Sequence, residues 1–342
     1  MRLLGLNESF DNVGFLQYTN LQWKRRYYEP GEFSVQIRAD DYNPQMRYLI
    51  TPERPEVGVI NRLRTTDTIK GEFVQLEGYF IEKVLSDSVV YPAFTKNGDP
   101  ASIACDAVDI FSPDGFLLSV DAPSVVGQST AVDWLGQELG SAVAEMLQTQ
   151  ELAHRIRLDF LNNTLHYSVW KGLDRTQSQS DNPFAVFSDG SVAVEQFKLT
   201  EDDSGYKNYA VIAYGEESSP QFEIVDQRKV GEPKRQIFLD YIGSNEELDA
   251  MKQSAAERLQ QYQRIQNAEI KCIQSGLYYL KDYDLGDKCD VVNHRLKKSY
   301  ESRIIGVDEV VKENRHIVSL IFGEKVPTNY SKLSRLARNM RR

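Results

Sequence analysis

The sequence is poor in cysteine and has no long apolar run. Its 342 residues include three cysteines, Cys105, Cys272 and Cys289. Their number and spacing fit neither a disulfide framework nor a CxxC metal site, which predicts a chain made in a reducing cytoplasm. No stretch approaches the roughly 20 apolar residues that a membrane span needs, so we expect no stable membrane insertion.

Positive charge is also scarce. The chain has 40 Lys and Arg residues against 50 Asp and Glu residues, which gives a net charge of −10 at pH 7. A protein that binds nucleic acid needs a basic surface that releases counterions from the phosphates. An anionic membrane surface attracts basic segments in the same way. The charge balance therefore argues against both kinds of binding.

The common catalytic motifs are missing. The sequence contains no GxSxG, Walker or GxGxxG motif, and its histidines do not form HExxH or HxH. His166 lies between apolar neighbours and is predicted to point outward from a strand. His154 follows a predicted helix, whose carbonyl end favours a cation. We therefore expect no catalytic, cofactor-binding or metal-binding residues. The four histidines are His154, His166, His294 and His316.

Two groups of carboxylates leave alternatives open. Glu77 and Glu82 flank an aromatic strand, and paired carboxylates near aromatic side chains also occur in glycoside hydrolases. The second group surrounds Gly286 and resembles a calcium loop, although it lacks the EF-hand spacing. We favour a tight turn there, because Asp accepts backbone hydrogen bonds and Gly adopts positive φ. The members of this second group are Asp282, Asp284, Asp287 and Asp290.

Strand patterns dominate residues 1–98. Residues 33–38 alternate between apolar and polar side chains, which is typical of a half-buried strand. Residues 73–81 predict a second strand of this kind. The Asn-Gly-Asp-Pro sequence at 97–100 is a strong structure breaker and marks a candidate domain boundary.

The middle of the chain mixes helix and strand patterns. Leu135, Leu139, Val143 and Met146 recur at helical spacing and predict a helix near 131–149. A hairpin should follow, with alternating strands on both sides of an Asn-Asn turn at 162–163.

The last part returns to strands around one long helix. Ser244 and Glu247 have the spacing of a capping box, and apolar residues at intervals of three and four predict a helix near 245–267. Strands are expected at 208–214, 236–240 and 288–292, followed by a hairpin of 303–311 with 316–322. The predicted fold class is therefore α+β with mostly antiparallel β structure.

The C-terminal segment 331–342 is the local exception in charge. Residues 332–342 carry five positive charges and no negative charge. Two interpretations have equal weight: a solvated chain end, or a helix that docks on an acidic partner such as a second copy of this chain.

Three separated segments resemble one family of phage proteins. They are similar to the opening, middle and closing motifs of siphophage tail-tip hub proteins of the ReqiPepy type, a family related to tail-associated lysin hub domains and baseplate hub proteins. Together the matches extend from residue 21 to residue 323. The residues that carry the resemblance are Trp23, Arg26, Tyr27, Gly31, Phe33, Gly172, Asp174, Arg175, Leu285, Gly286, Asp287, Arg303 and Gly323.

The resemblance implies a phage tail hub fold with two β-barrel-like domains and an inserted α/β domain. The first barrel would comprise 1–98, completed by about 205–240, the insertion 99–204, and the second barrel 241–330. Three chains would form a ring of six barrels. The motif residues would be structural: Trp23 and Phe33 in the first barrel, Gly286 and Asp287 at a turn, and the three arginines in ion pairs.

The resemblance also implies a function. The protein would be a non-enzymatic homotrimer of the virion tail that closes the tail tube and contacts distal tail or tube proteins and tail fibre or receptor-binding proteins. DNA would pass through without specific binding, and an acidic inner wall would repel its phosphates. The alternatives are a cell-wall hydrolase that uses Glu77 and Glu82, or a saccharide-binding module that uses Trp134 or Trp170.

Overall fold

The computed structural model describes residues 1–69, 71–115, 118–244, 247–260, 262–273, 275–312 and 315–323. The chain folds into two compact units. The larger unit comprises Met1–Lys198 and Glu269–Phe322, and the smaller one is built around Leu199–Ala268. The basic segment 331–342 lies outside the described residues.

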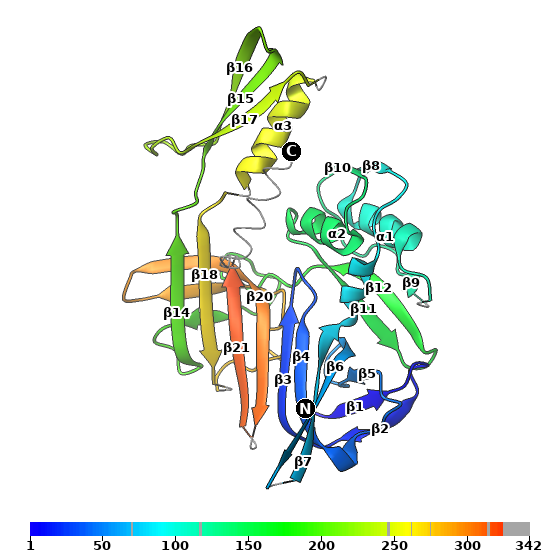
Figure 1. The fold of residues 1–342 in the computed structure, drawn as a ribbon. Coiled ribbons are helices and arrows are strands. Elements are labelled where there is room, and N and C mark those ends of the chain that lie inside the picture. Colours follow the sequence, from blue (N-terminus) through cyan, green and yellow to red (C-terminus); the bar gives the residue numbers. More distant parts are fainter. Residues whose placement is uncertain are drawn as a thin grey trace. The chain divides into compact units, whose positions relative to one another are not determined.

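The main sheet contains thirteen of the described strands and is almost entirely antiparallel. Its order is β14-β18-β21-β20-β3-β4-β7-β6-β5-β1-β2, with β19 pairing on β20 and β13 pairing in parallel on β19 (Figure 1). The strands are β1 (Leu3–Leu6), β2 (Asn12–Leu16), β3 (Tyr18–Arg26), β4 (Glu32–Arg38), β5 (Tyr48–Ile50), β6 (Val57–Thr68), β7 (Gly71–Phe80), β13 (Val186–Ser188), β14 (Val194–Asp202), β18 (Ile265–Cys272), β19 (Lys288–Asn293), β20 (Lys298–Lys312) and β21 (Arg315–Gly323).

The N-terminal half of this sheet curls around one apolar core. In β4 the side chains of Phe33, Val35 and Ile37 point inward, as the alternation at 33–38 predicted. The two outermost strands of this half, β2 and β3, are separated in the chain by Gln17 alone, and both contribute to the same core. The predicted class of mostly antiparallel β structure is confirmed, while the described strands form open sheets and none of them closes into a barrel.

Residues 81–170 form a helix-containing layer on the larger unit. Helices α1 and α2 pack against each other and against β11 and β12, around a core that includes Ala104, Val108, Val143 and Leu147 (Figure 1). The elements are η2 (Ile81–Asp87), β8 (Phe94–Gly98), α1 (Pro100–Phe111), β9 (Leu118–Val120), β10 (Thr130–Trp134), α2 (Leu139–Gln148), β11 (Ala153–Asp159) and β12 (Thr164–Trp170). A short η1 (Ala39–Asp41) lies outside this layer.

The helix predicted near 131–149 is shorter in the structure than the prediction. Its first residues form β10, and α2 starts only at Leu139. Gly136 adopts a positive φ of 76° between the two elements, and Leu135 is 61% exposed rather than part of the apolar face. The hairpin around residues 162–163 is confirmed by the antiparallel pairing of β11 with β12.

The smaller unit is a three-stranded sheet with one helix. Its strands β15 (Tyr209–Glu216), β16 (Ser219–Asp226) and β17 (Gln236–Ile242) have the order β16-β15-β17. They come from residues 205–240, which the sequence had assigned to the first barrel. Helix α3 (Leu248–Gln260) packs on one face of this sheet through Met251, Ala255 and Leu259. The prediction of a helix near 245–267 extended too far, because β18 begins at Ile265.

None of the helices in the described ranges combines the length and the apolar character that crossing a bilayer requires. The three cysteines are buried and free. Cys105 on α1 belongs to the apolar core of the helical layer, as expected for a small apolar residue.

Candidate functional site

The three family-like segments meet at one place in the larger unit. We call this place the three-segment junction and define it by Tyr27, Gly172, Arg175, Gly286, Asp287 and Arg303. Tyr27 follows β3, Gly172 follows β12, and Gly286 precedes β19. The backbone N–H of Gly172 donates to the Tyr27 hydroxyl at 3.3 Å, which joins residues 145 positions apart.

Two glycines allow the segments to approach this closely. A Cβ atom on Gly172 would lie 2.0 Å from the carbonyl carbon of Gly286. A Cβ atom on Gly286 would lie 2.5 Å from the ring of Tyr27, and Gly286 also adopts a φ of +85°. Real Cβ atoms do not make such contacts, so both positions require glycine.

Arg303 in β20 ties the junction to the helical layer. Its guanidinium donates to the Gly286 carbonyl oxygen and to the Glu151 carboxylate, the latter at 2.6 Å. It also lies 5.6 Å from the centre of the Tyr27 ring, within cation–π distance. Burial, the largest influence, raises the pKa of Tyr27 to about 12, so the phenol stays neutral.

Asp287 organises the turn before β19. Its carboxylate accepts hydrogen bonds from the Arg175 guanidinium at 2.6 Å, the Leu173 N–H at 2.9 Å and the Asp284 N–H at 3.0 Å. Burial raises the pKa of Asp287, against the lowering influence of these three donors. The Asp287 N–H donates to the Asp284 carbonyl, so the predicted turn is confirmed.

The remaining motif residues lie in the surrounding core and strands. Trp23 and Phe33 are buried on the same face of the sheet, with their ring centres 5.8 Å apart. Gly31 packs against the Phe80 ring and the Lys24 carbonyl, where a Cβ atom would clash. Leu285 is buried next to Gly286, within the turn before β19.

The other polar motif residues also have partners within the chain. Arg26 forms an ion pair with Asp308 at 2.5 Å. Asp174 accepts from the N–H and the hydroxyl of Thr176, which shapes the loop after β12. Gly323 ends β21 with a φ of +81°.

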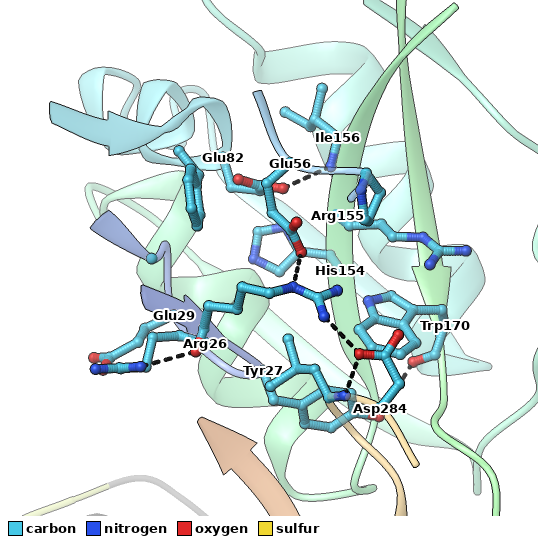
Figure 2. Close-up of a pocket in the computed structure, with 15 residues that line it drawn as sticks. Arg26, Tyr27, Glu29, Glu56, Glu82, His154, Arg155, Ile156, Trp170 and Asp284 are labelled. Atoms are coloured by element: carbon cyan, nitrogen blue, oxygen red, sulfur yellow. Dashed lines mark hydrogen bonds and ion pairs between the residues drawn. The ribbon is translucent and has the colours of Figure 1, made fainter. Parts of the chain in front are cut away.

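A partly enclosed polar cavity of about 60 Å³ lies beside the junction. Figure 2 shows that its lining side chains come from β3, from the segment before β6, from η2 and from β11. Arg25 crosses it and donates to Glu56 at 2.6 Å and to Asp284 at 2.5 Å. Glu82 accepts from the Ile156 N–H at 3.0 Å.

The structure corrects the interpretation of His154. This residue is buried in β11 and lines the cavity, so it does not sit as a cation at a helix end. Burial lowers the pKa of His154 to about 4, which makes the imidazole neutral at pH 7. His166 is partly exposed on β12, as predicted, and bonds to Asp121 at 2.9 Å.

The residues of the two alternative functions are dispersed. Glu77 forms ion pairs with Arg62 and Arg64 on β6, whereas Glu82 faces the buried cavity. Trp134 is 8% exposed and stacks on Phe94, so it offers no ring surface to a saccharide.

The acidic group around Gly286 is used within the protein. Asp282 accepts from the Tyr278 N–H and Asp290 from the Gln177 N–H, while Asp284 and Asp287 hold the arginines named above. Within the described ranges, no group of three or more His, Cys, Asp or Glu side chains could hold a metal ion.

The motifs and the fold around them agree with one family. The model of the Siphovirus ReqiPepy6 Gp37-like protein family matches residues 2–324. The chain belongs to this family. Among curated proteins, none matches it.

This family member shares its fold with solved tail proteins from three bacteria. A tail protein from Neisseria meningitidis MC58 is 11% identical, with a TM-score of 0.62 over 95% of this chain and 96% of the other. The 43 kDa tail protein of prophage MuSo2 from Shewanella oneidensis is 14% identical, with a TM-score of 0.61 over 94% and 98%. Prophage tail protein gp18 from Listeria monocytogenes EGD-e is 12% identical, with a TM-score of 0.59 over all of both chains.

Several residues of the site carry no signal in the sequence. Glu151, which binds Arg303, and Glu56, which binds Arg25, belong to no motif. Each pairs with a residue far away in the chain, so only the folded topology identifies the partner.

Proposed function

We propose that the protein is a structural, non-enzymatic component of a phage tail and forms the hub at the tail tip. The observation that carries this proposal is the family match over residues 2–324, together with the fold shared along the whole chain with three tail proteins. The motif residues support it, because their interactions serve packing within the chain.

The described sheet is open, and we infer that its two halves belong to a pair of barrel-like domains. The curled half from β3 to β2 adjoins the second half through one antiparallel pairing, Arg26 with Gly306 through Asn20 with Lys312. We assign the first domain to 1–98, completed by about 205–240, the inserted domain to 99–204 and the second domain to 241–330. Three chains would then place six such domains in a ring that matches a hexameric tail tube.

The charge of the chain fits a channel for DNA. Residues 81–170 contain twelve Asp and Glu against four Lys and Arg, a net charge of −8 out of the total of −10. We expect this segment to face the inner wall of the ring, where negative charge repels phosphates in transit. A ring whose inner wall is basic would contradict this arrangement.

The expected partners are other tail components. The hub would bind distal tail or tube proteins on one side and tail fibre or receptor-binding proteins on the other, after assembly in the host cytoplasm. The basic segment 331–342 is a candidate contact with an acidic partner, including a neighbouring copy of the chain.

Two measurements test the hub assignment. Light scattering of the purified chain should give a mass three times the 39.1 kDa of one chain, alone or on a tail partner. Electron microscopy of the virion should place the chain in a threefold ring at the tail tip. A strict monomer that assembles on no tail protein, or tails that lack the chain, would overturn the assignment.

The non-enzymatic part has a separate test. We expect no clearing of peptidoglycan in a zymogram. Clearing that is lost in Glu77→Gln or Glu82→Gln would establish the hydrolase alternative instead.

A further inference from the structure

The cavity beside the junction is lined by buried polar atoms without a protein partner. Five such atoms belong to residues that line the same space of about 60 Å³. They come from the segment before β6, from η2, from β11 and from the end of β12 (Figure 2). The atoms are Glu56 Oε2, Glu82 Oε2, His154 Nδ1, Arg155 Nε and Trp170 Nε1.

This set contains both donors and acceptors. Trp170 Nε1 and Arg155 Nε can only donate, a carboxylate oxygen accepts, and His154 Nδ1 does either according to its tautomer. Leaving one buried polar atom unpaired costs about 1–3 kcal/mol, and folded proteins leave few such atoms unpaired. Five in one cavity therefore indicate a ligand with both donors and acceptors.

The size of the cavity selects water. A water molecule needs about 10–15 Å³ of such volume, so the cavity has room for about four.

We propose that this cavity is a binding site for a cluster of ordered water molecules and for one proton, which is held on the carboxyl group of Glu82. The waters bridge Glu82 and Glu56 to His154, Arg155 and Trp170. They thereby connect the helical layer of residues 81–170 to the main sheet.

The charges around the cavity explain where the proton resides. Arg25 from β3 forms ion pairs with both Glu56 and Asp284, and Arg155 from β11 also lines the cavity, so the two cations already balance two carboxylates. An ionised Glu82 would be an unpaired buried charge, which is strongly unfavourable.

The other groups around Glu82 do not supply a cation. His154 is neutral, Glu29 adds negative charge at the rim, and Arg26 is engaged with Asp308. Burial, the largest influence, raises the pKa of Glu82 to about 7, with a smaller raising contribution from Glu56. Hydrogen bonds from the backbone and the charge of Arg155 act in the opposite direction.

A protonated Glu82 makes the site sensitive to pH near neutrality. Ionisation places an uncompensated charge between the helical layer and the sheet. The inference concerns this cavity alone and holds whichever tail role the chain has.

The first experiment measures thermal unfolding of the full chain between pH 5 and pH 8. Glu82→Gln keeps the shape and the hydrogen-bonding capacity of a protonated carboxyl but cannot ionise. Its unfolding midpoint should therefore rise relative to the wild type by several degrees as the pH increases. Glu77→Gln is the matched control and should follow the wild type. A Glu82→Gln midpoint that also follows the wild type would overturn the proton site.

Two further measurements do not depend on that variant being well folded. Infrared spectra of the wild-type chain should contain a protonated carboxyl band at pH 5.5 that disappears by pH 8.5. A high-resolution crystal structure should reveal waters within hydrogen-bond distance of the five atoms. A dry cavity, or a spectrum with no titrating carboxyl band in this range, would overturn the proposal.

Discussion

Two regions of the larger unit each bury a glutamate, and they treat it in opposite ways. At β20, Glu309 is fully buried and accepts hydrogen bonds from Arg54 Nε at 2.9 Å and Nη2 at 2.6 Å, and from His316 at 2.9 Å. In the cavity, Glu82 receives one backbone N–H from Ile156. Burial alone would raise the pKa of Glu309, but the hydrogen bonds from His316 and Arg54 and the arginine charge lower it to about 2.

The difference shows that donors, rather than depth, decide the protonation state of a buried carboxyl. Glu309 is ionised and forms an ion pair with Arg54, whereas Glu82 is a neutral acid at the cavity between the helical layer and the sheet. The same residue type therefore stabilises one region through charge and the other through a proton.

The largest expected effect is the loss of stability on replacing Glu309. Glu309→Gln leaves the buried Arg54 guanidinium, whose side chain is 5% exposed, opposite a neutral amide. We expect a loss of about 3–5 kcal/mol in the free energy of unfolding, measured in urea at pH 6. Glu82→Gln should not lower it under the same conditions, because the wild-type carboxyl is disfavoured in the folded chain at this pH. Equal losses in the two variants would contradict the comparison.

Much of the fold, but little of this comparison, follows from the sequence. The alternation at 33–38 predicts β4, and the Asn-Asn turn predicts the β11–β12 hairpin, because these patterns are local. Helix α1 is not among the predicted elements. The Asn-Gly-Asp-Pro sequence reads as a structure breaker, but in the structure its Asp99 caps the helix that begins at Pro100. Arg54 and Glu309 are 255 residues apart, and no local pattern connects them.

The contacts among the motif residues also cannot be derived from local sequence. The resemblance identified Tyr27, Gly172 and Gly286, but their mutual contact depends on three segments that meet only in the folded chain. Glu82 was noted as one of two carboxylates near an aromatic strand. Its burial beside His154 has no local sequence signal, because 65 residues separate η2 from β11.

The second prediction uses His154, which shares the cavity with Glu82 but titrates with the opposite sign. Its folded pKa of about 4 lies below the ordinary 6.5, so its stabilising contribution is present above pH 6.5 and is lost as the pH falls through 4. The contribution of protonated Glu82 is present below pH 4.5 and is lost as the pH rises through 7. The two slopes nearly cancel between pH 4.5 and 6.5.

Removing one group should uncover the slope of the other. In His154→Gln the free energy of unfolding should fall between pH 4.5 and pH 7, by up to roughly 3 kcal/mol for a shift of this size. In Glu82→Gln it should rise from pH 4 to pH 6.5. Urea unfolding at half-unit pH intervals measures both, and slopes of the same sign would refute the assignment.

The third prediction tests whether the junction next to the cavity is as tightly packed as the Glu309 region. Gly172→Ala forces a methyl group against the Gly286 carbonyl and should cost about 1–3 kcal/mol. Gly190→Ala is the matched control, because a Cβ atom there meets only His294 at 3.8 Å. If Gly172→Ala lowered the free energy of unfolding no more than Gly190→Ala does, the junction would not be tightly packed.

The smallest expected loss of stability concerns a third glutamate, Glu77, which is not buried and so serves as a reference for the other two. Glu77 lies on β7 with a side chain 28% exposed, and its contacts with Arg62 and Arg64 are long, at 3.5 and 3.6 Å. Exposed ion pairs of this kind contribute at most about 1 kcal/mol and are screened by salt. Glu77→Gln should therefore lower the free energy of unfolding by less than about 0.5 kcal/mol, and 1 M salt should abolish the difference. A larger loss that persists in salt would contradict this interpretation, because it would show that the partly exposed ion pairs of Glu77 stabilise the fold as a buried pair does.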